Sequence, residues 1–222
     1  MPKIHILGAS GSGTTTLGRT VADLLAVPHF DTDSFYWLPT DPPFTTPRPL
    51  TERLPLLMQH LPPTGGWVLS GSALKWAKPL EPLYELIVYL RLDPSIRMDR
   101  LRQRERTRYG RRIEPTGDMA TANAEFLAWA AAYDTVGPEQ RSRLAHEQWL
   151  AEQAAPVIRL DASKSVQALA GEVLSAARKA DWKIAGEKVC FPAKHARCIS
   201  QADGVKTQNL FVDSPSHSVR VR

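Results

Sequence analysis

Cysteine is scarce in this chain, and long apolar runs are missing from it. The two cysteines, Cys190 and Cys198, lie near the C-terminus without companion cysteines or paired histidines. They are therefore weak evidence for zinc, and a disulfide is not expected. No stretch approaches the ~18 consecutive apolar residues of a membrane helix, and the first residues lack the ~7–15 apolar residues of a signal core. We therefore expect a cytoplasmic protein without a membrane partner.

Basic charge, by contrast, is concentrated in one place. The 222 residues carry a net charge of +5 at pH 7. Residues 97–112 hold eight arginines against Asp99 and Glu105, whereas most of the remaining chain is close to balance or acidic. A single basic run indicates a local anionic ligand rather than general affinity for nucleic acid. The alternative is a solvated helix face, where many charge runs are found.

Short apolar runs alternate with helical patterns from residue 3 to residue 180. Continuous apolar runs are typical of parallel strands buried on both faces. We expect strands at 3–7, 67–70, 86–90 and 157–160, and a strand tip at 29–33. We expect helices at 14–26, 51–61, 94–108, 118–133, 138–151 and 163–180, and an extended proline-rich loop at 38–49. This alternation predicts an α/β fold with a mostly parallel sheet and helices on both faces.

The alternation also sets the expected domain organisation. A single domain is predicted for residues 1–180, because strand and helix patterns alternate through that range. From Asp181 to residue 222 there is no sustained periodicity, so a loosely ordered tail is expected. Within the second helix, Pro55 is expected to end the helix early or to kink it.

The strongest motif follows the first expected strand and opens the first expected helix. Its glycines, from Gly8 to Gly13, have the spacing of a Walker A phosphate loop, with Thr15 at the Ser/Thr position. Glycine lets the backbone curl so that its amides point at a polyphosphate, and the helix N-terminus adds its dipole. We predict that ATP and Mg²⁺ bind here. The predicted nucleotide-binding residues are Gly8, Ala9, Ser10, Gly11, Ser12, Gly13, Thr14, Thr15 and Thr16.

Thr14 stands where a Walker A loop normally has lysine. The loop therefore lacks a positive charge near the β- and γ-phosphates, which weakens the case for catalysis more than the case for binding. Lys75 and Lys78 are candidates to supply that charge. Two alternatives remain: a glycine turn without a ligand, and a dinucleotide-binding loop. The second requires glycine where Thr16 stands.

With this loop, the chain resembles the adenylate-kinase-like and shikimate-kinase-like branch of the P-loop kinases over about residues 3–180. The resemblance implies a three-layer α/β/α domain with a small arginine-rich lid. Asp31-Thr32-Asp33 resembles the Asp-x-Asp of shikimate and gluconate kinases. It implies that Asp31 and Thr15 hold magnesium, and that Asp33 binds the substrate or acts as general base. The alternative is a simple turn, since aspartate favours turns.

The arginine run supplies the expected lid. Residues 99–104 resemble the stretch that enters the lid of adenylate kinases, which implies that Arg100 and Arg104 contact the transferring phosphates. The lid is expected at about 104–117, with Gly110 and Gly117 as hinges. Closure of such a lid over a triphosphate would exclude water and limit wasteful hydrolysis.

Three further residues are candidates for the acceptor site. Gly71 follows the strand at 67–70, where the related kinases have a glycine-containing substrate loop. Ser70 stands there in place of the aspartate of many adenylate kinases, which weakens a Walker B assignment. Trp37 is a candidate for the pocket floor or for satellite core packing. Arg53 could bind an anionic group of the acceptor or lie on the surface.

These features support a functional hypothesis and two alternatives. The hypothesis is an ATP-binding phosphotransferase that passes the γ-phosphate to a nucleotide or a small hydroxylated metabolite. The first alternative, motivated by Thr14 and Ser70, is a nucleotide-binding regulator or pseudokinase with little transfer activity. The second is an ATPase that binds nucleic acid. It is disfavoured because Tyr109 is the one aromatic residue within the arginine run.

Overall fold

The computed structural model describes residues 1–179 of the chain and contains one five-stranded sheet, all of whose strands are parallel. Its order is β2-β3-β1-β4-β5. The strands are β1 (Lys3–Gly8), β2 (His29–Asp31), β3 (Trp67–Ser70), β4 (Leu86–Arg91) and β5 (Val157–Asp161). The predicted α/β fold class is confirmed. The loosely ordered tail expected from Asp181 lies outside the described residues, as do both cysteines.

Seven α-helices and three short 3-10 helices connect the strands in the described part. The α-helices are α1 (Thr14–Leu25), α2 (Thr32–Tyr36), α3 (Leu50–His60), α4 (Pro94–Tyr109), α5 (Ala120–Ala131), α6 (Arg143–Ala151) and α7 (Val166–Lys179). The 3-10 helices span Lys78–Leu83, Gly110–Ile113 and Ala132–Asp134. Between residues 1 and 179, no helix combines the length and apolar character needed to cross a bilayer.

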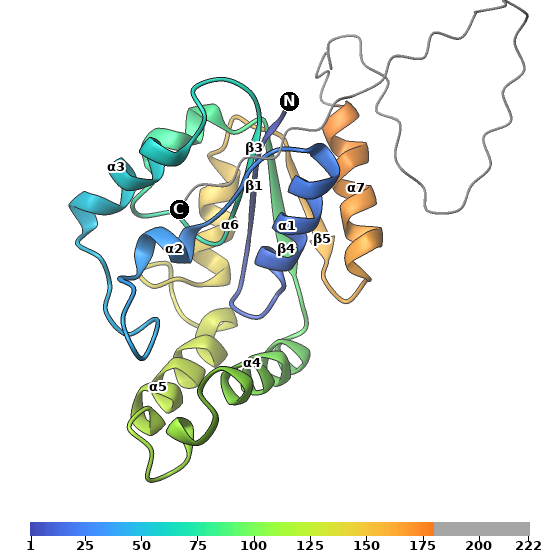
Figure 1. Ribbon diagram of the computed structural model, residues 1–222. Coiled ribbons are helices and arrows are strands. Elements are labelled where there is room, and N and C mark those ends of the chain that lie inside the picture. Colours follow the sequence, from blue (N-terminus) through green and yellow to red (C-terminus); the bar gives the residue numbers. More distant parts are fainter. Residues whose placement is uncertain (180–222) are drawn as a thin grey trace, which may run out of the picture. The chain divides into compact units, whose positions relative to one another are not determined.

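The sheet separates two apolar cores, because its central strands are buried on both faces. On one face, Ile6 and Val88 pack with α1 and α7 through residues such as Leu17 and Val173. On the other face, strand residues pack with Leu57 of α3 and Leu150 of α6. Figure 1 shows these helices on the two sides of the sheet. Continuous burial along β1 and β4 explains why their sequences show no polar alternation.

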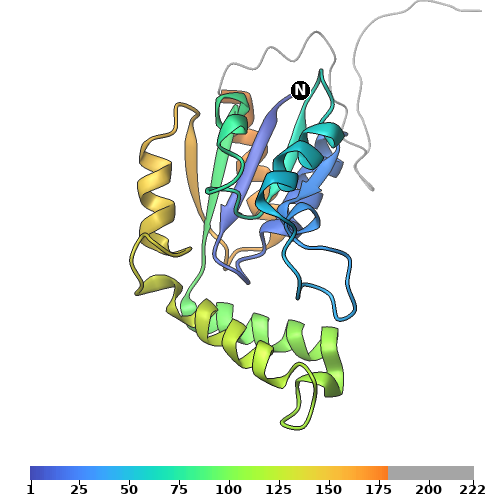
Figure 2. The same ribbon diagram turned by 90° about the vertical axis from the view of Figure 1, so that its left-hand side faces the viewer.

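Helices α4 and α5 lie together at the carboxyl end of the strands, as Figure 2 shows below the sheet. A third, small core holds them together, with Met98 and Leu101 of α4 packed against Ala130 of α5. Pro94 opens α4, and the carboxylate of Asp93 caps it by accepting from the Ser95 amide at 2.8 Å. The arginine-rich helix is thereby placed across the carboxyl ends of the strands.

Local structure departs from the sequence expectations at three points. Pro55 lies inside a continuous α3 and does not end it. Helix α6 begins at Arg143 rather than Pro138, because Ser142 caps it by accepting from the Ala145 amide at 3.0 Å. Asp33 lies in the first turn of α2 rather than at a strand tip. Asp31 is the last residue of β2, and its carboxylate caps α2 by accepting from the Asp33 amide.

Strand order decides where a ligand can bind. Strand β1 lies between β3 and β4, so the connections that leave β1 and β3 run to opposite sides of the sheet. In open parallel sheets, ligands bind outside the carboxyl ends of the strands at such a switch point. The glycine loop after β1 occupies that position.

Candidate active site

The loop between β1 and α1 has a backbone that requires glycine. Gly11 and Gly13 have φ angles of 85° and 93°, a region that side chains disfavour. A Cβ on Gly11 would also lie 2.9 Å from the Arg97 carbonyl oxygen of α4. Gly13 caps α1 without any side-chain hydrogen bond, so the first amides of the helix stay free for a ligand.

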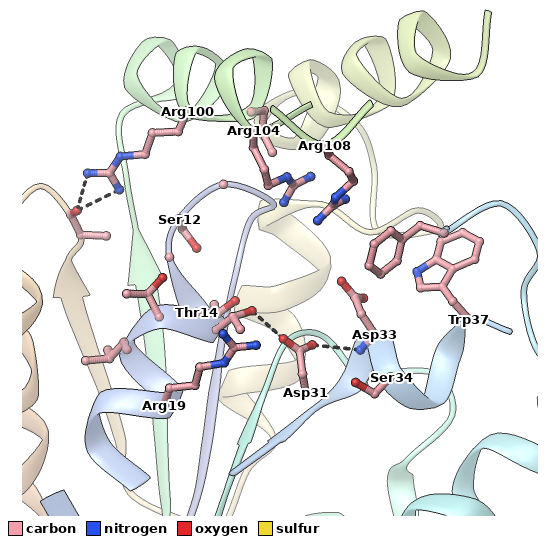
Figure 3. Close-up of a pocket in the computed structure, with 18 of the residues that line it drawn as sticks. Ser12, Thr14, Arg19, Asp31, Asp33, Ser34, Trp37, Arg100, Arg104 and Arg108 are labelled. Carbon is pink, nitrogen blue, oxygen red and sulfur yellow. Dashed lines mark hydrogen bonds between the residues drawn. The ribbon is translucent and has the colours of Figure 1, made fainter. Parts of the chain in front are cut away.

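A cleft of about 960 Å³ opens in front of this loop. It is bounded by the loop and α1, by α2 with the proline-rich loop, by α4, and by the start of α7 (Figure 3). The predicted site residues that line it are Gly11, Ser12, Gly13, Thr14, Thr15, Thr16, Asp31, Asp33, Trp37, Arg100 and Arg104. Residues far apart in the sequence thus meet in one cavity.

Thr15 and Asp31 form a hydrogen-bonded pair on the cleft floor. The Thr15 hydroxyl donates to Oδ2 of Asp31 at 2.6 Å. The other oxygen, Oδ1, accepts from the Asp33 amide at 3.0 Å. Both oxygens of Asp31 are therefore fixed, one by the end of the phosphate-binding loop and one by α2. The pair that the resemblance assigned to magnesium is brought together.

Asp33 is the carboxylate that faces the middle of the cleft in Figure 3. Although Asp33 is exposed to the cleft, the surrounding protein reduces its hydration, and this desolvation raises its pKa above the ordinary value. The nearby negative charge of Asp31 raises that pKa further, whereas Arg141, Arg104 and Arg108 oppose the rise. A carboxylate with a raised pKa is better suited to accept a proton than one in water.

Three arginines one helical turn apart project from α4. Arg104 and Arg108 point toward the space between the loop and Asp33, whereas Arg100 points to the far end of the cleft (Figure 3). There both Arg100 terminal nitrogens lie 3.4 Å from the Ala162 carbonyl oxygen. Arg100, predicted to contact the transferring phosphates, is thus placed farther from Asp33 than Arg104 is. Arg108, which lies within the predicted lid, occupies the nearer position.

The proline-rich loop forms an apolar wall opposite the phosphate-binding loop. Trp37 and Phe44 meet edge to face with ring centroids 6.4 Å apart, and both line the cleft. The Arg108 guanidinium lies over the Phe44 ring, 4.3 Å from its centroid. The Tyr109 hydroxyl donates to the Pro43 carbonyl oxygen at 2.8 Å. The wall is therefore fastened to α4.

Several predicted site residues do not line the cleft. Arg53 lies over the Tyr36 ring at 3.8 Å, and its Nε donates to the Arg48 carbonyl oxygen. Gly71 packs against Thr32, whose Oγ1 leaves no room for a Cβ there. The loop's first three residues, Gly8, Ala9 and Ser10, also lie outside the cleft lining. Ser70, the substituted acidic position, pairs its Oγ with Nε2 of His29 at 2.9 Å.

Other residues join the site without having been predicted for it. Arg48 lines the acceptor side of the cleft, Lys164 lines the end near α7, and Arg19 lines the floor. Arg141 donates from Nη2 to the Gly8 carbonyl oxygen at 2.8 Å. Arg141 therefore braces the start of the loop. Helical periodicity could have identified Arg19 as a site residue, because it follows Thr15 by one turn of the same helix.

The residues present fit a magnesium-bound triphosphate. The Ser12 Oγ is buried and has no hydrogen-bond partner among residues 1–179, and Ser12 lines the cleft. Free helix amides and the two left-handed glycines add donors for phosphate oxygens. No cluster of three or more metal-ligating side chains occurs in the described range. Magnesium would therefore depend on Thr15, Asp31 and the phosphates themselves.

Comparison with known proteins finds one relative in sequence and several neighbours in fold. No protein-family model matches the chain. It is 41% identical over 171 residues to YqaC, an uncharacterized protein of Bacillus subtilis (strain 168), covering 77% of this chain and 94% of YqaC. Shikimate kinase from Bacteroides thetaiotaomicron superposes with a TM-score of 0.50 at 14% identity, covering 80% of this chain and 98% of the kinase. Deoxyadenosine kinase from M. mycoides gives a TM-score of 0.49 at 12% identity, with coverage of 80% and 99%.

Sheet order, loop and superposition together define the fold class as the three-layer α/β/α fold of the P-loop kinases. The relationship to YqaC is more specific, because it extends over nearly all of that protein at the level of sequence. This chain belongs to the same family as YqaC.

Proposed function

We propose that this chain is an ATP-dependent phosphotransferase whose acceptor is a nucleotide or a small hydroxylated metabolite. One arrangement carries the proposal. Asp33, a carboxylate with a raised pKa, faces Arg104 and Arg108 across the opening of a glycine loop at a helix N-terminus. A site that only bound nucleotide would not need a proton acceptor beside the expected γ-phosphate position.

Each part of the cleft has a task in this reaction. The loop amides, the α1 N-terminus and the Ser12 hydroxyl hold the triphosphate. Thr15 and Asp31 would hold Mg²⁺, which supplies positive charge to the phosphates when it is bound. The aromatic wall of Trp37 and Phe44 suits an apolar or planar face of the acceptor.

Transfer requires one proton movement and one exchange of P–O bonds. The acceptor hydroxyl gives its proton to Asp33 as its oxygen bonds to the γ-phosphorus, and the bond from that phosphorus to the bridging oxygen breaks, releasing ADP. Arg104 and Arg108 stabilise negative charge on the transferring group. Because α4 forms one wall of the cleft, it limits the access of water to that group.

A nucleotide-binding regulator without transfer activity is the less favoured function, since it leaves Asp33 and the two arginines without a task. The cytoplasmic location expected from the sequence stays a prediction, as does the assignment of residues 181–222 to a tail.

The test is a coupled assay for ADP release with Mg²⁺ and ATP across nucleosides, nucleoside monophosphates and hydroxylated metabolites. At least one acceptor is expected to raise turnover well above the hydrolysis rate, because positioned acceptors replace water in the closed cleft. ATP binding by calorimetry without any acceptor that stimulates turnover would contradict the proposed activity.

A further inference from the structure

The proposed reaction leaves one charge unassigned. In a Walker A loop, a lysine reaches the β- and γ-phosphates, but this chain has Thr14 at that position. A threonine hydroxyl can donate a hydrogen bond but carries no charge. Neither lysine suggested by the sequence lines the cleft, and Lys75 instead donates to the Glu139 carbonyl oxygen. Another cation has to act if the loop retains full affinity for triphosphate.

The basic side chains of the cleft differ in how far they are already engaged. Five of them have protein partners. Arg48 bonds to the Phe35 carbonyl oxygen, Arg100 contacts that of Ala162, Arg104 and Arg108 pair with Glu105, and Lys164 pairs with Glu172. Arg19 is exposed and has no hydrogen bond or ion pair within residues 1–179. It is therefore the cleft cation that can meet an incoming anion without breaking a hydrogen bond or an ion pair.

Its place on α1 directs Arg19 toward the loop. Arg19 follows Thr15 by four residues, which puts both on the same face of the helix. Side chains on a helix lean toward its N-terminus, so a long arginine reaches back over the preceding turn. Figure 3 shows the guanidinium directed back toward Thr14 and Asp31, at the cleft floor.

We infer that Arg19 supplies the positive charge that the loop lacks at Thr14, by contacting the phosphate chain of the bound nucleotide from within α1. This inference rests on the proposed binding of ATP to the loop. A guanidinium suits the task because it is always charged and offers several donors to phosphate oxygens. The positive charge that a Walker A lysine would carry is then displaced by about one helical turn and is not lost.

The experiment compares Arg19→Met with a matched control, Arg102→Met, by calorimetry with Mg²⁺-ATP and with AMP on the full chain. Arg102 is also exposed, but it lies on α4 outside the cleft and pairs with Asp99. Loss of one charged contact is expected to weaken ATP binding roughly 10- to 100-fold in Arg19→Met. AMP binding is expected to change by less than about threefold, because AMP has no β- or γ-phosphate. Arg102→Met is expected to match the wild type.

A second variant tests the relocation itself. Adding Thr14→Lys to Arg19→Met returns a cation to the loop, and it is expected to restore most of the lost ATP affinity. Thermal melting without nucleotide controls for folding, and Arg19→Met is expected to melt with the wild type because the side chain is exposed and has no hydrogen bond or ion pair within residues 1–179.

The outcomes separate this inference from the proposed function. If the wild type does not bind Mg²⁺-ATP, the proposed function fails. If the wild type binds ATP and Arg19→Met binds it equally well, only the inference is overturned. It is also overturned if Arg19→Met weakens AMP binding as much as ATP binding, or if the double variant binds ATP no more tightly than Arg19→Met does.

Discussion

Asp33 shows how much a single residue gains from its tertiary surroundings. Its neighbour Asp31 is held by Thr15 and by the α2 backbone, so that carboxylate stays fixed on the cleft floor. The surrounding protein reduces the hydration of the Asp33 carboxylate, and this desolvation together with the charge of Asp31 raises its pKa. Two carboxylates two residues apart are thereby given different tasks, one toward the metal and one toward the acceptor proton.

Replacing Asp33 with asparagine removes the proton acceptor while preserving shape. We expect turnover to fall by about 10²–10⁴-fold, and ATP affinity measured by calorimetry to change little, because the loop amides are untouched. Ser34→Ala, at the neighbouring cleft residue, is the matched control and is expected to have a much smaller effect. Unchanged turnover in Asp33→Asn would remove this residue from the mechanism.

Among residues, the sequence predicted those whose role depends on a local motif. Gly11 to Thr16 line the cleft, because a strand followed by a glycine loop and a helix places these residues by local structure alone. Asp31 and Asp33 join them from the end of β2 and the start of α2. Arg53 and Gly71 do not line it. Their expected places depended on how α3 and the segment after β3 pack, which the motif does not specify.

At the scale of elements, the proline-rich loop and α4 act as one wall of the cleft. Two contacts join them, the Tyr109 hydroxyl to the Pro43 carbonyl oxygen and Arg108 over the Phe44 ring. Arg112, in the 3-10 helix that follows α4, adds an ion pair to Asp41 at 2.8 Å. Arg112 also pairs with Asp118 at 2.7 Å, beyond the 3-10 turn that follows α4. The lid expected at about 104–117 is thus connected to the acceptor side of the site.

Tyr109→Phe removes the hydrogen bond between α4 and the Pro43 carbonyl oxygen. A neutral hydrogen bond contributes about 1 kcal/mol, so opening of the loop is expected to become roughly fivefold easier. Hydrogen exchange should report this at the amides of Leu38 and Arg48, which bond to the Thr46 and Tyr36 carbonyl oxygens. Tyr84→Phe is the control, because Tyr84 lies in the core on the α3 and α6 face of the sheet. Exchange as slow as in the wild type would show that this hydrogen bond does not restrain the loop.

At the scale of the whole molecule, the core on the α3 and α6 face of the sheet contains two neutral histidines. Burial lowers the pKa of His5 to about 4 and that of His146 to about 3. His146 takes part in a buried chain, in which its Nδ1 contacts the Tyr133 hydroxyl at 2.7 Å and that hydroxyl contacts Tyr89 at 2.8 Å. The core therefore depends on both imidazoles being uncharged.

Acid should destabilise the protein through these histidines. Their folded pKa values lie below the unfolded value of about 6.5, so their stabilising contribution is complete above that pH and is lost as pH falls toward 4 and 3. Between pH 7.5 and pH 5, denaturant unfolding should lose on the order of 2 kcal/mol for each histidine.

Substitution identifies the source of that loss. His5→Phe keeps an aromatic ring stacked on Tyr84. In this variant, the free energy of unfolding should differ less between pH 7.5 and pH 5 than it does in the wild type. His60→Gln at an exposed position is the control. A pH dependence that is the same in both variants and the wild type would contradict the histidine explanation.

The sequence by itself determined the order of strands and helices, the parallel sheet and the phosphate-binding loop, because periodicity and glycine spacing act between residues close along the chain. Tertiary structure alone decided the site around that loop. It brought Arg108 and Phe44 together, raised the pKa of Asp33 and left Arg53 outside. These features arise between elements that meet only when the sheet and its helices pack, and no local pattern encodes the distance or burial that results.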